Sequence, residues 1–212
     1  MLEKITVSYQ GVKGSYSYQA SSEFFQDVNY RGYRSFYSAI KAVHKGESDY
    51  AMIPVENSTA GRVMEVYNLL PESDLHIVGE YLLPINHCLM IPFKSFRGAP
   101  PNGTMTTDEI IAWKKSPLSS EEKAEALSGI REIRSHPQAL EQCRKFIKSD
   151  LPNVTLRGVN DTAISIRDIA SSTDRSIAAI ASSSAGEIYH SIVLAENIQD
   201  IKNNTTRFLA LG

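Results

Sequence analysis

Cysteine is scarce in this chain, and long apolar runs are missing from it. Its 212 residues hold two cysteines, Cys88 and Cys143, which lie far apart and form no Cys-x-x-Cys pair. A chain of this length needs no disulfide staple, and the spacing favours two reduced, buried thiols over an oxidised pair. Because no segment approaches the roughly 18 consecutive apolar residues of a membrane helix, a membrane-spanning protein is excluded too. The first residues lead into strand-like sequence rather than a signal peptide, so we expect a cytoplasmic protein.

A surplus of positive charge is also absent. The chain carries 22 Lys and Arg against 24 Asp and Glu, which gives a net charge of −2. A sequence-independent nucleic-acid binder needs a basic surplus, so that class is excluded. The five histidines lack the His-x-x-x-His spacing of metal ligands, and the sequence has neither a phosphate-binding glycine loop nor a Gly-x-Ser-x-Gly elbow. We therefore expect no metal site, no nucleotide site and no serine hydrolase.

The sequence does contain a regular alternation of strand-like and helix-like segments. Such alternation is typical of an α/β protein with mostly parallel sheets and helices on both faces. Strands are expected at residues 5–9, 50–55, 130–134, 154–158, 177–181, 192–196 and 208–211, with an extended stretch at 75–90. Helices are expected to begin at Ser15, Ser35, Gly61, Pro137, Asp161 and Ser184.

Segment 92–129 interrupts this alternation. It is rich in Pro, Gly and Ser at first, and then Ser119 and Glu122 form a capping-box pattern ahead of a short charged helix that ends at Gly129. We interpret the segment as an insertion with one or two helices of its own. Trp113 lies within it, and we expect this side chain to anchor the segment to the body of the protein or to a partner.

Polar residues gather where the expected strands end. Ligands of parallel sheets bind beyond the carboxyl ends of the strands, where the free N–H groups of helix N-termini suit a small anion. Helix capping alone explains any single polar turn, so the sharper prediction is that the turns converge on one cleft. Five turns of this kind occur, at residues 14–15, 56–59, 135–136, 160–162 and 182–184.

Two further positions present chemistry at a strand end. Glu56 and Asn57 follow Pro54 directly, so a carboxylate and an amide stand where a strand stops. Arg207 enters the last expected strand, and its planar guanidinium matches a carboxylate through two parallel hydrogen bonds. A solvated flank is the commoner role of an arginine at such a position.

Several segments together resemble the prephenate dehydratase family. The glycine turn at 9–17, the Pro-x-Glu-Asn-Ser segment at 53–58 and the Asn-x-Thr-Arg-Phe segment at 204–208 match motifs of that family. Further matches follow in the family's order at 77–80, 85–89, 135–140 and 178–182. The resemblance extends from about residue 5 to residue 211, and the pairing of Glu-Asn-Ser with Thr-Arg-Phe is its most specific part.

The resemblance implies a two-lobed fold similar to type II periplasmic binding proteins, with a cleft between the lobes. Residues 1–84 and 191–212 would form the first lobe, and residues 85–190 the second. The sequence shows no counterpart of the regulatory domain or the chorismate mutase domain that family members often carry. We therefore expect either no feedback through the regulatory domain or a chain trimmed from a longer protein. A homodimer is expected by analogy. Two further departures are Gln10 in place of the usual Leu and the long segment 92–129.

The activity implied by the resemblance is decarboxylation and dehydration of prephenate to phenylpyruvate, in phenylalanine biosynthesis. Thr206 would donate a hydrogen bond to the leaving hydroxyl, with Asn57 assisting and Glu56 or water relaying the proton. Arg207 would hold a substrate carboxylate. No cofactor is expected, because the reaction involves no redox change. The other implied substrate-binding residues are Ser15, Ser58, Thr59, Ser135, Gln138, Thr162 and Phe208.

Three alternatives remain open at this point. Arogenate, which differs from prephenate only by an amine in place of the side-chain carbonyl, is the preferred substrate of plant-type relatives. A prephenate decarboxylase of the same fold would remove CO2 without losing the hydroxyl, but it would lack the donor threonine. A non-catalytic anion-binding protein would share the two-lobed fold, and the complete Glu-Asn-Ser motif argues against it.

Overall fold

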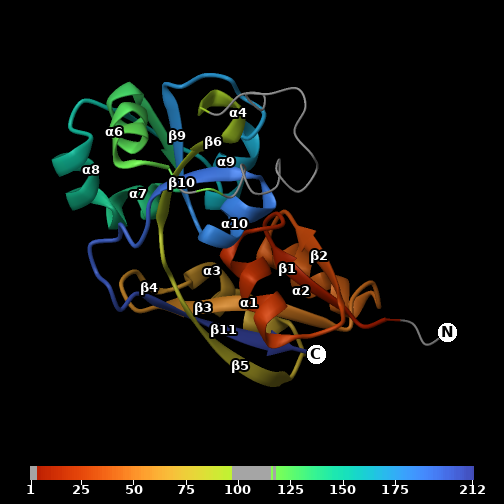
Figure 1. The fold of residues 1–212 in the computed structure, drawn as a ribbon. Coiled ribbons are helices and arrows are strands. Elements are labelled where there is room, and N and C mark those ends of the chain that lie inside the picture. Colours follow the sequence, from red (N-terminus) through yellow and green to blue (C-terminus); the bar gives the residue numbers. More distant parts are fainter. Residues whose placement is uncertain (1–3, 97–115, 117) are drawn as a thin grey trace, which may run out of the picture. The chain divides into compact units, whose positions relative to one another are not determined.

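The computed structural model describes residues 4–96, 116 and 118–212. The chain divides into two compact units, each with its own mixed β-sheet (Figure 1). Unit 1 comprises Met1–Asn86 and Ile201–Gly212, and unit 2 comprises His87–Asp200. The expected α/β class and the division into two parts are confirmed.

Unit 1 holds one sheet in which the C-terminal strand lies inside rather than at an edge. The neighbouring strands are, in spatial order, β2 (Asn29–Tyr33), β1 (Thr6–Gln10), β3 (Tyr50–Asn57), β11 (Thr205–Leu211) and β5 (Ile77–Pro84), and the short β4 (Gly61–Arg62) pairs with β3. Strands β1, β2 and β3 run parallel, whereas β11 is antiparallel to both β3 and β5. Figure 1 shows the blue β11 beside the orange β3.

Helices cover both faces of this sheet because buried side chains alternate along its strands. One cluster includes Ile53, Val55 and Leu209, and it packs against helices α2 (Phe36–His44) and α3 (Met64–Leu69). The other cluster includes Val7, Met52 and Phe208, and it packs against α1 (Tyr16–Phe24). A 3-10 turn (Leu70–Glu72) follows α3.

Unit 2 repeats the mixed arrangement with different strands. Its sheet has the order β10 (Ser191–Ala195), β6 (Cys88–Pro92), β9 (Ile177–Ala181), β7 (Glu132–Ser135) and β8 (Thr155–Gly158). Strands β7, β8 and β9 are parallel, and β6 is antiparallel to β9 and β10. The described helices of this unit are α4 (Phe93–Phe96), α6 (Ser120–Gly129), α7 (Pro137–Gln142), α8 (Arg144–Asp150), α9 (Thr162–Ile169) and α10 (Ser183–Ile188).

Two expectations about the architecture were wrong. The sheets are mixed rather than mostly parallel, because β11 enters unit 1 and β6 and β10 enter unit 2 in antiparallel directions. The expected lobe boundary at residue 191 is also wrong. Strand β10 belongs to unit 2, where it pairs with β6, and the chain returns to unit 1 only at Ile201.

Single elements also differ from expectation. Segment 61–70 begins as the short strand β4 before α3, and the helix expected from Pro137 breaks at Cys143 into α7 and α8. Strand β2 was not predicted at all. Three predicted helix starts, at Ser15, Ser35 and Asp161, are confirmed by side-chain caps, and the capping box of Ser119 and Glu122 is present. The helix expected from Ser184 begins instead at Ser183, with Ser182 as its cap.

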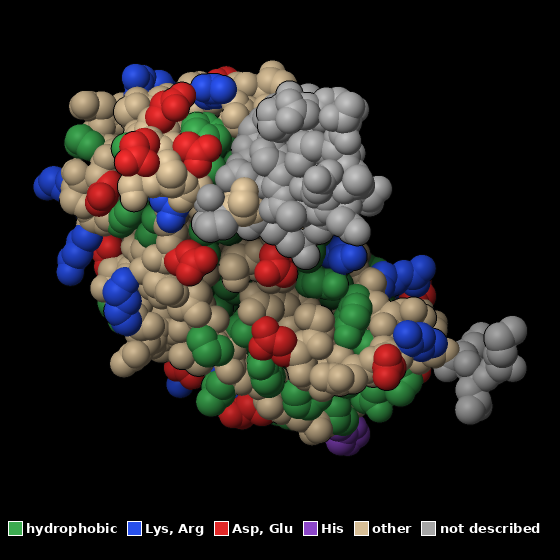
Figure 2. Space-filling model, viewed as in Figure 1, with side chains coloured by type: hydrophobic (Ala, Val, Ile, Leu, Met, Phe, Trp, Pro, Cys, Tyr) green, Lys and Arg blue, Asp and Glu red, His purple; other side chains and the backbone are tan. Residues whose placement is uncertain are grey.

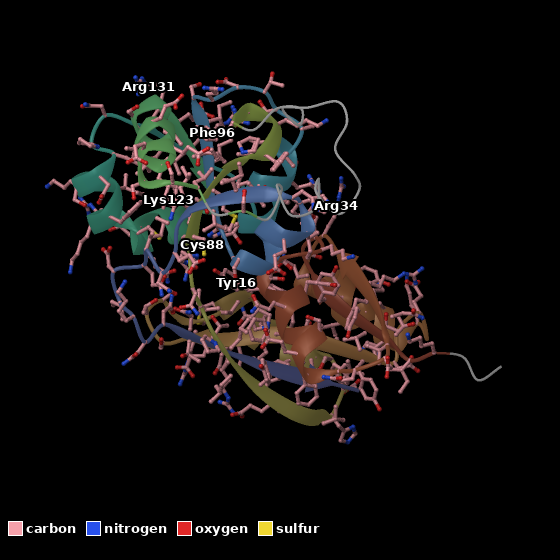
Figure 3. The ribbon with its side chains drawn as sticks, in the orientation of Figure 1. Tyr16, Arg34, Cys88, Phe96, Lys123 and Arg131 are labelled. Atoms are coloured by element: carbon pink, nitrogen blue, oxygen red, sulfur yellow. The ribbon has the colours of Figure 1, made fainter. Side chains whose placement is uncertain are left out.

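Part of the expected insertion is described, and part is not. Helices α4 and α6 lie within it, whereas Trp113 lies outside the described residues. Both cysteines are free and buried, as expected, and Figure 3 labels Cys88 on β6. Within the described ranges, no helix is long and apolar enough to cross a bilayer.

Candidate active site

A β-bulge in β3 turns Asn57 toward the last strand. Opposite β11, Thr206 pairs with Asn57 and Arg207 with Glu56, but Phe208 pairs with Pro54, so that Val55 is an extra residue in β3. Side chains alternate along a strand, and one extra residue reverses the face on which the next ones lie. The bulge therefore brings the Asn57 side chain to the same face as Thr206.

The amide oxygen of Asn57 is fixed by the turn that follows it. It accepts hydrogen bonds from the backbone N–H groups of Thr59 and Ala60, each at 3.0 Å, and from the Thr59 hydroxyl at 2.7 Å. Backbone N–H groups only donate, so these bonds decide which side-chain atom is oxygen and which is nitrogen. The Asn57 amide nitrogen must therefore face the other way.

That nitrogen, Nδ2, reaches the start of β11. It donates to the Asn204 amide oxygen at 2.7 Å and to the Thr206 hydroxyl oxygen at 2.9 Å, with a weaker contact to the Thr205 carbonyl at 3.3 Å. The side chains of Asn57, Asn204 and Thr206 are all buried. We call these three residues with Thr59 the amide–hydroxyl network.

The network leaves the Thr206 proton available. A threonine hydroxyl has one donor hydrogen and two acceptor lone pairs, and the Asn57 amide occupies a lone pair. No acceptor for this hydrogen occurs among the residues that the structure describes. The arrangement therefore presents the Thr206 hydroxyl as a hydrogen-bond donor that the amide polarises.

Neighbouring contacts hold the network in place. Ser58 and Thr205 exchange two hydrogen bonds of 2.9 Å, one of which uses the Ser58 hydroxyl as an acceptor. The Ile85 N–H donates to the Asn204 carbonyl, and the Tyr16 hydroxyl donates to the Asn86 carbonyl, which links the first turn of α1 to this end of the sheet. Figure 3 labels Tyr16 at that position. Ser15, next to it, is buried and caps α1 through a bond from Tyr18 N–H.

Glu56 and Arg207 lie on the opposite face of the strands from the network. The Arg207 guanidinium donates from Nε and Nη2 to one Glu80 oxygen, at 2.9 and 2.6 Å, and Glu80 raises the pKa of Arg207. The structure does not support the expected role of Arg207 as holder of a substrate carboxylate, because the guanidinium lies on the face away from the network and already bonds to a carboxylate of the chain through Nε and Nη2. The expected relay from Thr206 through Glu56 is wrong for a geometric reason: Glu56 neighbours Asn57 in β3, and neighbouring residues in a strand face opposite sides.

Phe208 also departs from its expected role. Its side chain is 1% exposed and packs in the α1-side core with Met52 and Leu83. A side chain in that position contributes packing and has no surface for a substrate. Its place follows from the alternation along β11, where Thr206 and Phe208 share one face.

In unit 2, three of the predicted polar turns follow neighbouring parallel strands. They stand after β7, β8 and β9, as expected for one edge of a parallel sheet. The Ser135 hydroxyl is fully buried and donates to the Ile180 carbonyl at 2.6 Å, so its proton serves the fold. Thr162 is buried at the start of α9, and Gln138 is exposed in α7.

Two titratable side chains at this edge, His136 and Asp161, interact with each other, and the sequence did not predict that interaction. Asp161 caps α9 and burial raises its pKa, while burial lowers the pKa of His136. Each charge favours the ionised form of the other, and burial opposes it. The described residues contain no group of three or more His, Cys, Asp or Glu that suits a metal ion.

Comparison of the sequence with known protein families identifies the family of this chain. The family model described as prephenate dehydratase matches residues 7–212. The chain belongs to the prephenate dehydratase family. The predicted resemblance is thereby confirmed over nearly the whole sequence.

Relatives of the prephenate dehydratase family include bacterial and plant proteins. The chain is 32% identical over 210 residues to the bifunctional chorismate mutase/prephenate dehydratase of Enterobacter agglomerans, covering 97% of this chain and 46% of that protein. It is 35% identical over 213 residues to arogenate dehydratase 1 of Petunia hybrida, covering 98% and 42%. The chain thus spans about half the length of the curated relatives it matches.

Solved structures with a similar fold include a prephenate dehydratase and a protein of another description. A prephenate dehydratase from Arthrobacter aurescens in complex with L-Phe has a TM-score of 0.77 at 25% identity, covering 98% of this chain and 60% of that one. A structure described as GqqA, a novel type of quorum quenching acylase, has a TM-score of 0.74 at 28% identity, covering 98% and 63%.

Within the prephenate dehydratase motif at the C-terminus, sequence reasoning gave Asn204 no role. The residue was quoted as part of Asn-x-Thr-Arg-Phe, yet asparagine before a strand is ordinarily a turn residue. Its place in the amide–hydroxyl network depends on Asn57, 147 positions earlier in the chain. Only the motif itself could have drawn attention to it.

Proposed function

We propose that this chain catalyses the decarboxylating dehydration of prephenate to phenylpyruvate, a step of phenylalanine biosynthesis. The single observation that carries the proposal is the hydrogen bond from Asn57 to Thr206 within the two most specific motifs of the family. It supports a neutral donor held at the strand ends, which is what loss of a hydroxyl group requires.

The driving force of this reaction lies in the substrate. Prephenate carries a carboxylate on C1 and a hydroxyl on C4 of a cyclohexadiene ring, and loss of both as CO2 and water makes the ring aromatic. The C1–carboxylate bond supplies the electron pair, and the C4–oxygen bond accepts it as hydroxide leaves. The protein has to orient the dianion and protonate or stabilise the leaving oxygen.

Thr206 suits the second task as a hydrogen-bond donor. A threonine hydroxyl is too weak an acid to ionise by itself, but donation from the Asn57 amide draws charge from its oxygen and strengthens its O–H as a donor. Positioned donors and acids contribute about 10²–10⁴-fold to rate. Neutral donors also suit the ring carboxylate, because a strong cationic grip would oppose its loss as CO2.

The substrate-binding part of the proposal is narrower than the sequence suggested. Arg207, Phe208, Ser58 and Ser135 act in the fold, through the contacts described above. Thr59 acts through Asn57, whose oxygen it holds. Ser15, Gln138 and Thr162, all at helix starts, remain the proposed binding residues.

Replacement of Thr206 tests the proposal. We expect Thr206→Ala to lower kcat/KM for prephenate by about 10²–10⁴-fold, because the donor is lost, and Thr206→Ser to restore most of it. Phenylpyruvate is followed by its absorbance in alkali. Thr205→Ala is the matched control, since it removes the neighbouring threonine side chain outside the network. A Thr206→Ala variant with wild-type turnover would contradict the proposal.

Arogenate is the second candidate substrate, and the 35% identity to a Petunia arogenate dehydratase supports it. The leaving hydroxyl and ring carboxylate are the same in both compounds, so the amide–hydroxyl network suits either. Parallel assays of phenylpyruvate from prephenate and of phenylalanine from arogenate distinguish them. Prephenate consumption without either product would instead identify a decarboxylase, and a thermal shift without turnover would identify a binding protein.

The similarity to a quorum quenching acylase raises hydrolysis as a further possibility. Acyl transfer by a hydroxyl nucleophile needs a base within hydrogen-bond reach. Thr206 is bonded to an amide nitrogen, which has no proton-accepting capacity, and this favours elimination over acyl transfer. Incubation with an N-acylated signal compound is the direct comparison, and acyl release would favour hydrolysis.

We further propose a homodimer in the cytoplasm. Two free, buried thiols support a reducing compartment. Strand β5 is an edge strand of the unit 1 sheet and pairs with β11 on its other side. It exposes the apolar side chains of Ile77, Val78 and Leu82, and apolar side chains gather over this edge in Figure 2. Exposed apolar edge strands are a usual site of association between copies. Sedimentation at a monomer mass would contradict the dimer.

A further inference from the structure

The Asn204 amide group is buried and only half of it has a partner. Asn204 is 2% exposed, and its oxygen accepts from Asn57 Nδ2 at 2.7 Å and from the Thr59 hydroxyl at 3.4 Å. Its nitrogen, Nδ2, is buried and bonds to no acceptor among the described residues. A buried donor without a partner opposes folding, so natural proteins rarely keep one without a purpose.

The orientation of this amide follows from the backbone. Asparagine oxygen and nitrogen are assigned from their surroundings, so each assignment needs an unambiguous neighbour. The Thr59 and Ala60 N–H groups fix the Asn57 oxygen, and the Asn57 nitrogen then requires an oxygen on Asn204. Turning the Asn204 amide over would set two N–H groups against each other. The unpaired atom of Asn204 is therefore its donor nitrogen.

The network thus contains two hydrogen-bond donors that have no acceptor in the described chain. Asn57 Nδ2 donates to Asn204 and to Thr206, and each of those residues keeps N–H or O–H hydrogens that meet no acceptor in the described chain. Both residues lie at the start of β11 and are separated by Thr205 alone. The accepting oxygens that the network reaches, on Asn57, Asn204 and Thr205, already receive hydrogen bonds, so a ligand for this pair has to bring its own oxygen atoms.

From this arrangement we propose that Asn204 is a substrate-binding donor, whose Nδ2 group donates to an oxygen of the substrate beside the leaving hydroxyl. The inference rests on the proposed function for the identity of the substrate, a cyclic hydroxy acid rich in oxygen acceptors. Thr206 and Asn204 then act as a pair, one on the leaving oxygen and the other on a neighbouring oxygen. Neither donor carries charge, which suits a substrate that must release its carboxylate.

Asn204→Asp separates donation from positioning. The introduced carboxylate still accepts from Asn57, so the Thr206 hydroxyl keeps its place, but the ionised group has no hydrogen to donate. We expect kcat/KM to fall by about 10- to 100-fold at pH 8, the range that loss of one hydrogen bond to a charged or leaving group produces. Asn203→Asp is the matched control, because it adds the same charge at the exposed neighbouring residue and should leave kcat/KM unchanged.

The pH profile identifies donation. A protonated carboxyl group donates an O–H, and burial at this position, which is 2% exposed, raises the pKa of the introduced carboxyl above its ordinary value of about 3.9. The ratio of variant to wild-type kcat/KM should therefore rise as pH falls from about 8.5 to about 5.5. The rate without enzyme is subtracted at each pH. A flat ratio, or turnover close to wild type at pH 8, would show that Asn204 acts only as an acceptor for Asn57 and would overturn the proposal.

A binding measurement keeps this inference separate from the catalytic one. In ¹H–¹⁵N spectra, the side-chain amide peaks of Asn204, assigned by their loss in Asn204→Asp, should shift when prephenate is added to Thr206→Ala protein. The Asn203 peaks serve as an internal reference. A shift with no phenylpyruvate from the wild type would refute the proposed function and keep the donor role. Turnover by the wild type with unmoved Asn204 peaks would support the proposed function and refute the donor role of Asn204.

Discussion

At the scale of single residues, Asn57 shows how one side chain serves two neighbours at once. Its oxygen is held by the turn that ends β3, and its nitrogen is thereby aimed at β11. The motif predicted that Asn57 and Thr206 belong together, but it did not predict how. A direct hydrogen bond across paired strands makes Asn57 a positioning residue. Because Asn57 donates to Thr206 and Asn204, the hydrogens of those two residues stay available for a ligand.

The Arg207–Glu80 pair yields a prediction at the same scale. Both side chains are nearly half exposed, and they lie on the face of β11 away from Thr206. Exposed ion pairs contribute little to stability and are screened by salt. We expect Arg207→Gln and Glu80→Gln to change kcat/KM by less than about threefold, and the double variant to be no less stable than either single variant.

Steady-state kinetics and thermal melts of the three variants measure this. The outcome that would restore the carboxylate-binding role of Arg207 is a large rise in KM for Arg207→Gln that Glu80→Gln does not share. Glu80 thus serves as the matched control, since it removes the same ion pair from its other side.

At the scale of elements, β2 was missed because it carries no apolar pattern. Its sequence Asn-Tyr-Arg-Gly-Tyr is half polar, and its residues are exposed or half-buried at the edge of the unit 1 sheet. An edge strand has one strand neighbour, and β2 is held through backbone bonds to β1. Pattern-based prediction depends on burial, so it fails where the backbone alone supplies the pairing.

The segments confirmed most closely are the opposite case. The expected strand at 177–181 coincides with β9, which is buried along most of its length. Helix starts at Ser15, Ser35 and Asp161 were predicted from capping residues, and each side chain accepts a backbone N–H in the structure. Local chemistry decides such features, so a local sequence suffices to predict them.

Gly79 in β5 gives a prediction at the element scale. A Cβ atom at this position would lie 2.4 Å from Phe24 Cζ of α1, and the Phe24 ring is held by Phe25 and Tyr81. Gly79→Ala therefore overpacks the contact between helix and strand. We expect it to lower the free energy of unfolding by about 1–3 kcal/mol, measured by urea denaturation.

Gly129 is the matched control for this change. A Cβ there would lie 3.6 Å from its nearest neighbour, the Arg175 carbonyl, and the residue ends α6. Gly129→Ala should be neutral or slightly stabilising, by up to about 1 kcal/mol. Equal stability of the two variants would show that α1 moves aside without cost.

At the scale of the whole molecule, each unit has its own core and its own buried polar groups. His87, the first residue of unit 2, is 2% exposed; its Nε2 faces Gln142 Oε1 at 2.9 Å, and its N–H donates to Gln199. Burial lowers the pKa of His87, while the bond to Gln142 opposes that shift. The folded chain therefore holds a neutral imidazole that the unfolded chain protonates near pH 6.5.

The pH dependence of stability follows from this difference. As pH falls below about 6.5, the unfolded state binds a proton that the folded state does not, so stability decreases by at most about 1.4 kcal/mol per pH unit for this group. We expect His87→Gln to flatten the fall in urea midpoint between about pH 7.5 and 5.5. The slope is reduced rather than abolished, because burial lowers the pKa of His136 as well.

His44→Gln provides the comparison, since His44 is exposed at the end of α2. This variant should keep the wild-type slope. A His87→Gln variant whose midpoint falls as steeply as the wild type would contradict the assignment of that loss to His87.

The sequence by itself determined the family, the α/β class, the capped helix starts and the pairing of two motifs, because these depend on residue order and local chemistry. The tertiary structure decided which faces those motifs present. A single extra residue in β3 turns Asn57 toward Thr206, while alternation along the strands sends Glu56 and Arg207 to the other side. Strand register and face are set by pairing between segments distant in the chain, and no local pattern encodes them.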